Sequence, residues 1–294
     1  MSRSTFLGFL AACAAALIGS GWQITSRHGV TTTLGPVELA VLRYGVPALV
    51  LLPVLLRSTG LFPAGLPKRH LAMLVVGGGL PFGLMVMAGA QWAPAAHIGV
   101  FVSGSLPLFT ALGARWVDGT PITGLRLAGL VLVAVGLAGF GFIDPAGLAL
   151  NWRGDLCFLL AAMLWAVYTL VSRRAGLTAW QGTALVNAWS ALLLLPLVLV
   201  VGAPRLLTAP WSDVAWQALG QGVMAGLLGL FTYLVAVAHL GAARASLSAA
   251  LVPLLTACGA ALLLGEPLQP QTAAAAALVA FGVLCAAFSS QTGR

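Results

Sequence analysis

Long apolar runs separated by short polar segments divide this chain into regular pieces. Each run holds about 20 residues with few charges, the length that a helix needs to cross roughly 30 Å of hydrocarbon. The pattern predicts ten membrane spans, at residues 5–25, 36–56, 70–90, 95–116, 123–142, 154–173, 180–201, 214–237, 242–264 and 271–289. The longest polar stretch, residues 202–213, is too short for a soluble domain. We therefore expect an all-α polytopic membrane protein.

The sequence also repeats itself at a fixed offset of 146 positions. Residues 107–114 read PLFTALGA and residues 253–260 read PLLTACGA, and eight of the fifteen positions from 107 to 121 match their partners. The same offset pairs Gly8 with Gly154, Ser26 with Ser172, Arg27 with Arg173, Gly83 with Gly229 and Gly136 with Gly282. Five spans per half is an odd number, so two halves of the same order must face opposite sides of the membrane. We predict two inverted five-helix repeats, at residues 1–146 and 147–294.

Composition and charge fit this picture. Hydrophobic residues make up 60% of the chain and charged residues 7%, with a mean hydropathy of +1.03. A cytoplasmic N-terminus puts ten Lys and Arg residues in cytoplasmic loops and three in the loops opposite, as the positive-inside rule requires. This predicts a multi-pass protein of the plasma (bacterial inner) membrane with both termini cytoplasmic. The basic residues are scattered over separate loops and form no stripe, so the net charge of +8 does not indicate a nucleic-acid partner.

Two prolines mark candidate breaks near the middle of the bundle. Pro107 and Pro253 fall near the midpoints of spans four and nine, where proline removes a backbone hydrogen bond and frees the carbonyls of Ser103 and Ala249. Matched breaks in both halves of a transporter indicate a substrate site near the midplane. The alternative is a plain packing kink. Small residues on the same face, such as Gly99 in span four, favour a packing seam between spans four and nine or against their neighbours.

Aromatic and polar side chains offer a second symmetric feature. Trp22 and Gln23 in span one align with Tyr168 and Thr169 in span six, and Trp165 lies one turn earlier. Deep aromatic residues line cavities for apolar ligands and supply a hydrogen bond. Trp189 and Tyr233 share that depth, whereas five Trp residues near span ends are interpreted as interface anchors: Trp92, Trp116, Trp152, Trp180 and Trp211.

Few ionisable residues lie within the spans. Arg43, about two turns into span two, is a coupling candidate, with snorkelling or a pair with Glu38 as alternatives. His97 is a second coupling candidate, because its unperturbed pKa lies near neutrality, although a His at a helix end is often simply solvated. Asp118 and Glu266 lie near span ends, where we expect capping or structural pairing. The four Cys have neither metal nor disulfide spacing, so no metal or cofactor is expected.

These features together resemble the EamA family of the drug/metabolite transporter superfamily. The resemblance covers essentially the whole chain and includes Arg43 in span two, the Pro-x-x-Thr-Ala run in both halves, and Leu-Gly-Glu-Pro-Leu at residues 264–268. It implies two inverted five-helix repeats around a central cavity lined by spans one, three, four, six, eight and nine. The matching positions are Trp22, Gln23, Ser103, Trp165, Tyr168, Tyr233, Ser246 and Ser248. One departure is Thr120, where the family commonly has a Glu equivalent to Glu266.

The resemblance implies export of small metabolites, often amino acids. The shortage of buried charge favours neutral or zwitterionic substrates, such as amino acids or aromatic compounds, moved by alternating access. The partners expected are this substrate and membrane lipid, and the chain is expected to be a monomer or homodimer. An uptake carrier or a lipid-linked flippase is the alternative within transport. An intramembrane enzyme is disfavoured, because its catalytic cluster would need His and acidic residues that are dispersed here.

Overall fold

The computed structural model describes residues 3–143 and 145–288. It describes the side chains at these positions except at 140–143, 145–148, 230, 234, 237, 241–249 and 288. Every regular element in this part of the chain is a helix, and no strand occurs in it. The expectation of an all-helical protein is therefore confirmed for the described residues.

The first half of the chain runs from α1 to α9. Its elements are α1 (Arg3–Thr31), α2 (Pro36–Ala40), η1 (Val41–Gly45), α3 (Val46–Val50), α4 (Leu52–Val54), η2 (Leu55–Thr59), α5 (Lys68–Gly78), α6 (Leu80–Gly89), α7 (Ala95–Ile98), η3 (Gly99–Gly104), α8 (Leu106–Asp118) and α9 (Gly124–Ile143), where η denotes a π-helical segment. The second half contains α10 (Pro145–Ser172), α11 (Ala179–Val201), α12 (Arg205–Thr208), α13 (Trp211–Gln217), η4 (Ala218–Gly229), α14 (Leu230–Leu264) and α15 (Pro270–Phe288).

Seven helices of the described chain are long and apolar enough to cross a membrane, and an eighth is added if the pair Pro36–Val50 and Leu52–Thr59, bent by 52°, is one span. Two shorter apolar helices, Gly124–Gly139 and Ala250–Leu264, coincide with predicted spans five and nine. The protein is thus a polytopic helical membrane protein, and the count of ten stays a prediction. Predicted spans eight and nine meet within the element α14, whose two parts run in opposite directions along α1. Leu240 and Gly229 lie near Gly8 and Ile18, whereas Val252 and Gly259 lie near Gly19 and Ile24.

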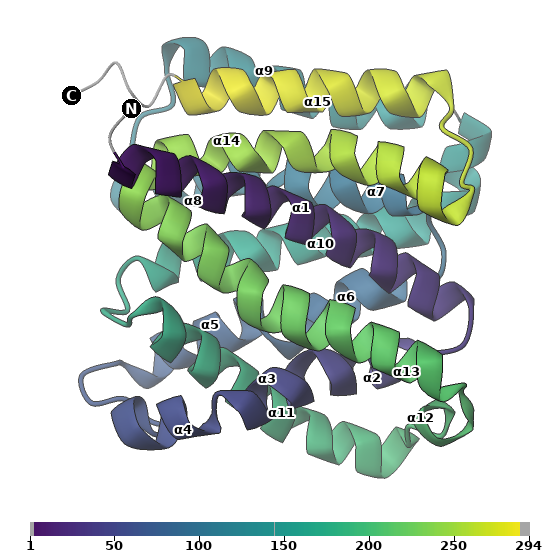
Figure 1. Ribbon diagram of the computed structural model, residues 1–294. Coiled ribbons are helices and arrows are strands. Elements are labelled where there is room, and N and C mark those ends of the chain that lie inside the picture. Colours follow the sequence, from purple (N-terminus) through teal and green to yellow (C-terminus); the bar gives the residue numbers. More distant parts are fainter. Residues whose placement is uncertain (1–2, 144, 289–294) are drawn as a thin grey trace.

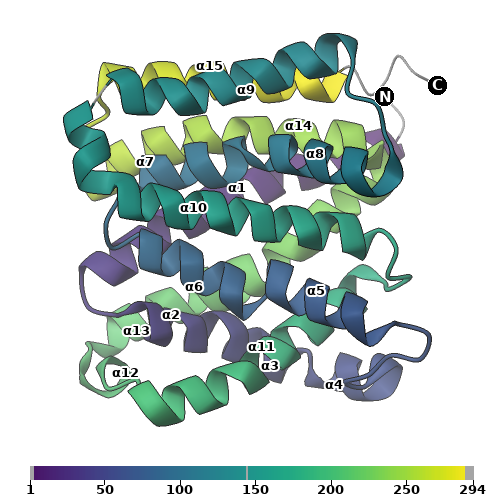
Figure 2. The ribbon, with the colours of Figure 1, turned by 180° about the vertical axis from the view of Figure 1, so that it is seen from behind.

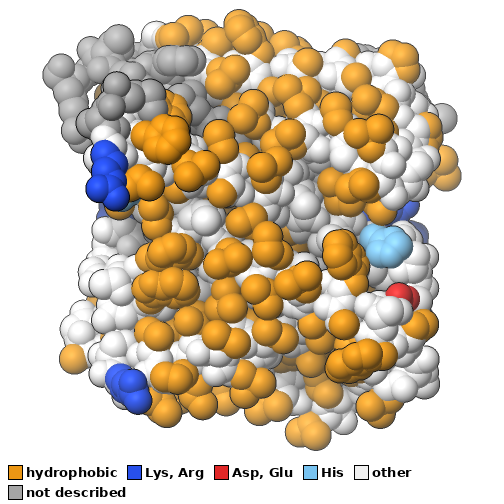
Figure 3. All heavy atoms as spheres, in the orientation of Figure 1, with side chains coloured by type: hydrophobic (Ala, Val, Ile, Leu, Met, Phe, Trp, Pro, Cys, Tyr) orange, Lys and Arg blue, Asp and Glu red, His pale blue; other side chains and the backbone are white. Residues whose placement is uncertain are grey.

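The helices form a bundle whose ends carry the charges. In Figure 1, α1 begins and α15 ends at the same end of the bundle, and α10 runs in the direction opposite to α1 (Figures 1 and 2). Hydrophobic side chains spread over the face in Figure 3, while the Lys, Arg, His and acidic side chains visible there lie at its left and right edges. Exposed Leu, Val, Phe and Met side chains occur on most of the long helices. This distribution suits a bundle whose sides contact lipid.

Span three contains a break that the sequence pattern did not predict. The expected helix at 70–90 is divided at Gly79 into α5 and α6, and Pro81 in the first turn of α6 lacks the N–H that would continue the hydrogen bonding. Two buried side chains bind the interrupted backbone. The Tyr44 hydroxyl donates to the Gly79 carbonyl at 2.6 Å, and the Leu80 N–H donates to Ser190 Oγ at 3.0 Å. Hydrocarbon offers no such partners, so protein side chains must supply them.

Glycines permit the closest helix contacts. A Cβ at Gly282 would lie 2.7 Å from the Gly129 carbonyl oxygen, and a Cβ at Gly129 would collide with the backbone at Ala286. These two residues therefore let α9 and α15 pack backbone against backbone, as small residues do in membrane helices. On the other side of the bundle, a Cβ at Gly78 in α5 would lie 2.7 Å from the Tyr168 ring of α10. That contact fixes where the Tyr168 ring lies.

Candidate functional site

Gln23 connects three helices in the interior. It lies on α1 and is 2% exposed. Its Nε2 donates to Ser103 Oγ of η3 at 2.8 Å, and its Oε1 accepts from Thr256 Oγ1 of α14 at 2.8 Å. The predicted pair Gln23 and Ser103 is thus brought together, and α14 adds a partner from the second half of the chain.

Close packing of η3 on α14 supports this contact. A Cβ at Gly99 would lie 3.0 Å from Thr256 Cβ and 3.1 Å from Pro253 Cα, so only a very small residue fits there. The seam between spans four and nine is confirmed at this position. Gly113, further along the chain in α8, instead faces Leu170 of α10.

Trp22 extends the polar contacts from α1 to η4. Its Nε1 donates to Gln221 Oε1 at 2.8 Å, and Gln221 Nε2 donates in turn to Ser26 Oγ at 3.0 Å. Trp22 is 8% exposed and Gln221 is completely buried. An indole N–H buried in a membrane protein needs such an acceptor.

A row of aromatic rings runs from Trp22 towards α10. The Trp22 and Phe82 centroids are 5.7 Å apart, those of Phe82 and Trp165 are 4.6 Å apart, and those of Trp165 and Tyr168 are 5.1 Å apart. Phe82 of α6 therefore joins two predicted aromatic groups that come from opposite halves of the chain. We call Trp22, Gln23, Phe82, Ser103, Trp165, Tyr168 and Thr256 the central cluster.

Arg43 lies beside this cluster. Its guanidinium carbon is 4.4 Å from the centroid of the Trp22 ring, within the range of a cation–π contact, and its side chain is 7% exposed. The alternative pairing with Glu38 is not formed. Glu38 instead accepts hydrogen bonds from the backbone N–H groups of Gly35 and Arg205. Snorkelling to the interface is also not observed, because the side chain is buried.

His97 is buried and not solvated. Its Nδ1 lies 2.7 Å from Asp155 Oδ1, and the two side chains are 9% and 7% exposed. Asp155 was not singled out from the sequence, because the two residues are 58 positions apart and belong to different halves of the chain. The pair joins α7 to α10, and the coupling role of His97 stays a prediction.

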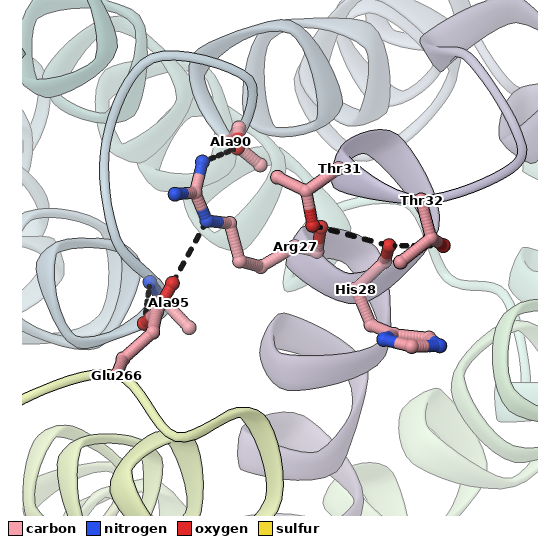
Figure 4. A network of polar contacts seen from close by, with 7 residues as sticks. All are labelled: Arg27, His28, Thr31, Thr32, Ala90, Ala95 and Glu266. Atoms are coloured by element: carbon pink, nitrogen blue, oxygen red, sulfur yellow. Dashed lines mark hydrogen bonds and ion pairs between the residues drawn. The ribbon is translucent and has the colours of Figure 1, made fainter.

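A network at the C-terminal end of α1 joins three parts of the bundle (Figure 4). Arg27 Nε donates to Glu266 Oε1 at 2.8 Å, and Arg27 Nη1 donates to the Ala90 carbonyl at 2.6 Å. Glu266 Oε2 accepts from the Ala95 N–H at 2.8 Å. The expected pairing and capping role of Glu266 is confirmed. This network ties the ends of α1, α6 and α14 to the start of α7.

A second ion pair also joins a long helix of one half to a helix end of the other half, with the roles of the two halves exchanged. Arg174, just after α10, donates to Asp118 at the end of α8. In the first network α1, the first helix of the first half, meets the C-terminal end of α14. In this pair α10, the first helix of the second half, meets the C-terminal end of α8. The Arg174 and Asp118 side chains are 44% and 40% exposed, against 20% and 17% for Arg27 and Glu266. Because α1 and α10 run in opposite directions, the two networks lie at opposite ends of the bundle (Figures 1 and 2).

The remaining predicted residues have varied positions. Pro107 lies in the first turn of α8, just after η3 ends, so a helix break is present in the first half. The prediction of a matching break at Pro253 in the second half is wrong, because the helix continues through this residue. Thr169 donates to the Trp165 carbonyl of its own helix, and Tyr233 is a half-buried residue of α14. Ser246 and Ser248 lie outside the described side chains.

Phe82, Gln221 and Asp155 are among the interior residues that the sequence did not single out. Phe82 and Asp155 have no distinctive spacing. Gln221 carries a usable signal, since an uncharged polar residue within an apolar run must find a hydrogen-bond partner in the bundle.

The lipid-compatible surface and the long apolar helices define a polytopic helical membrane protein. The model of the EamA-like transporter family matches the chain twice, over residues 6–142 and 152–288. The chain therefore belongs to the EamA-like transporter family, within the drug/metabolite transporter superfamily.

Curated relatives and a solved structure agree with this membership. The chain is 26% identical over 262 residues to an uncharacterized transporter, YyaM, of Bacillus subtilis (strain 168), covering 85% of this chain and 84% of that protein. It is 34% identical over 187 residues to the uncharacterized protein PA1977 of Pseudomonas aeruginosa, covering 62% and 63% of the two chains. A crystal structure with 21% sequence identity superposes with a TM-score of 0.65 over 100% of this chain and 98% of that chain, which shows a shared fold.

Proposed function

We propose that this transporter exports small neutral or zwitterionic metabolites, foremost amino acids or aromatic compounds, across the bacterial inner membrane by alternating access. The observation that carries this proposal is the presence of two ion-pair networks at opposite ends of the bundle, with the central cluster between them. Opening one network while the other stays closed would expose the cluster to one side of the membrane at a time.

The two halves of the chain supply the two rocking units in this proposal. The family model matches each half once, with starting positions 6 and 152 that are 146 residues apart, as in the internal repeat. The opposite directions of α1 and α10 support an inverted arrangement (Figures 1 and 2). Inverted repeats commonly bind substrate at their interface near the bilayer midplane. Gln23 lies at such an interface, since Ser103 and Thr256 belong to different halves.

The central cluster suits a small ligand with an apolar or aromatic part. Phe82 and Trp165 provide ring surfaces, and the Gln23, Ser103 and Thr256 groups can exchange their mutual hydrogen bonds for bonds to a ligand. Transport requires such exchange, because a site that binds too tightly does not release its substrate.

Transport assays with purified protein in proteoliposomes test this function. A panel of radiolabelled amino acids and aromatic compounds is loaded on one side, and both orientations are examined through side-specific inactivation. We expect Trp165→Ala and Tyr168→Ala to lower transport at least tenfold without loss of folded protein. Trp116→Ala is the matched control, because Trp116 is 94% exposed in the last turn of α8 and does not belong to the cluster. Wild-type rates for both cluster variants would remove these residues from the site, and movement only towards the cytoplasmic side would identify an uptake carrier.

A further inference from the structure

Arg43 carries a buried positive charge that no described carboxylate neutralises. It is the only buried Lys or Arg among the side chains that the structure describes. The described acidic side chains all bind elsewhere: Glu38 to Gly35 and Arg205, Asp118 to Arg174, Asp155 to His97, Asp213 to Ser212, and Glu266 to Arg27. An ionisable residue inside a membrane protein indicates a functional site, because burying an uncompensated charge is costly.

The guanidinium also has unused hydrogen-bond donors. Within the described part of the chain, Arg43 Nε and Nη1 are buried and have no hydrogen-bond partner. The face of the Trp22 ring at 4.4 Å offsets part of the lost hydration but leaves these N–H groups unsatisfied. A ligand that meets both needs supplies oxygen acceptors and one negative charge.

The backbone around Arg43 points to a site and not to an accidental burial. Arg43 lies in the π-helical segment η1, and such segments frequently occur at functional sites. The neighbouring segment η4 approaches so closely that a Cβ at Gly226 would lie 2.9 Å from the Arg43 carbonyl oxygen. Trp22 connects this place to Phe82 and the aromatic row. A ligand bound at Arg43 can therefore extend along these rings.

We infer that Arg43 binds the carboxylate of the substrate, whose apolar or aromatic body packs against Trp22, Phe82 and Trp165. The inference rests on the proposed transport function, because it takes the ligand of Arg43 to be the transported substrate. A carboxylate matches the single unpaired charge. A phosphate, with a charge of about −1.5 to −2, would need a second buried cation, and no other described Lys or Arg side chain is buried.

Thermal unfolding of the purified full-length protein tests the inference with three probes of one shape: 3-phenylpropanoate, its uncharged amide 3-phenylpropanamide, and phenylalanine. A ligand that binds the folded state raises its apparent melting temperature. We expect one or both carboxylates to stabilise the wild type in a concentration-dependent way. The amide should bind about 10- to 100-fold more weakly, because it cannot form a charge-assisted hydrogen bond with the guanidinium. Phenylalanine shows whether an added ammonium group is tolerated.

Arg43→Met separates binding from folding. If Arg43 serves the ligand, this variant has an unchanged or higher melting temperature without ligand, and the preference for carboxylate over amide disappears. Arg43→Lys keeps the charge and should retain part of the preference. Arg57→Gln, at an exposed position in η2, is the matched control and should behave as the wild type.

Three results would overturn the inference: equal stabilisation by amide and carboxylates, a retained carboxylate preference in Arg43→Met, or no stabilisation of the wild type by either carboxylate. Failure of the proposed function looks different. If proteoliposomes move none of the panel compounds while the Arg43-dependent preference persists, the carboxylate site stands and the transport proposal falls. If the wild type transports carboxylate and amide equally well, the function stands and the role of Arg43 falls.

Discussion

Thr110 and Thr256 hold equivalent positions in the two sequence repeats but differ in hydrogen bonding. Thr256 Oγ1 donates to Gln23 Oε1 at 2.8 Å, and the Thr256 side chain is completely buried. Thr110 Oγ1 is also buried, but it has no hydrogen-bond partner within the described residues. The same substitution, Thr→Val, therefore removes a satisfied hydroxyl at one position and an unsatisfied hydroxyl at the other.

The expected effects follow from these contacts. Hydrogen bonds between membrane helices contribute about 0.6 kcal/mol on average and about 1.7 kcal/mol at most, so Thr256→Val should lower the free energy of unfolding by an amount in that range. Thr110→Val should leave it unchanged or raise it, because the lone hydroxyl has already lost its hydration. Gln23→Leu should cost about 1–3 kcal/mol, since it removes bonds to both Ser103 and Thr256.

Unfolding in mixed micelles, monitored by tryptophan fluorescence, measures these free energies. The double variant Gln23→Leu with Thr256→Val completes a cycle, and its coupling energy should equal the contribution of their shared bond. Equal losses for Thr110→Val and Thr256→Val, or a coupling energy of zero, would refute the assignment of Gln23 as the polar connection between the halves.

The remaining predictions concern packing and the buried ion pair. Gly129→Ala should lower stability by about 1–3 kcal/mol, because its Cβ would meet the α15 backbone, whereas Gly21→Ala, with no atom within 4 Å of the new Cβ, should not. The same unfolding assay checks both, and equal effects would contradict the close contact of α9 with α15. Asp155→Ala should lower stability by about 1–3 kcal/mol, because it removes the acceptor beside His97 Nδ1, while Asp155→Asn keeps an oxygen there and should cost less. Thermal unfolding of the two variants tests this expectation, and equal melting temperatures for Asp155→Ala and Asp155→Asn would contradict it.

Much of the helical architecture could be predicted from local sequence. Apolar runs set the positions of most long helices, and the fixed offset of the repeat placed Trp22 and Tyr168 on equivalent helices. The break at Gly79 was missed because its polar backbone is bound by Tyr44 and Ser190, which are distant in sequence. Pro253 shows the opposite failure, since the backbone is helical on both sides of a residue that usually interrupts helices.

The candidate site could be predicted in part. Hydrophobicity and depth indicated Trp22, Gln23, Ser103 and Trp165, which the structure places close to one another or to shared neighbours. The partners of these residues depend on which helices meet. The periodicity of side chains within one helix does not show which other helix it contacts, so the sequence did not predict Phe82 as a neighbour of Trp22 and Trp165.

Distances across the two ends of the bundle test alternating access most directly. Spin labels are placed at exposed positions 32 and 269 near the Arg27 network, and at exposed positions 117 and 173 near the Arg174 pair, in a background with Ala at the four Cys positions. Glu266→Gln weakens the first network and Asp118→Asn weakens the second. Pulsed electron paramagnetic resonance should show a longer 32–269 distance with no lengthening of 117–173 in Glu266→Gln, and the reverse in Asp118→Asn. Unchanged distances in both variants, or both ends opening together, would contradict alternating access.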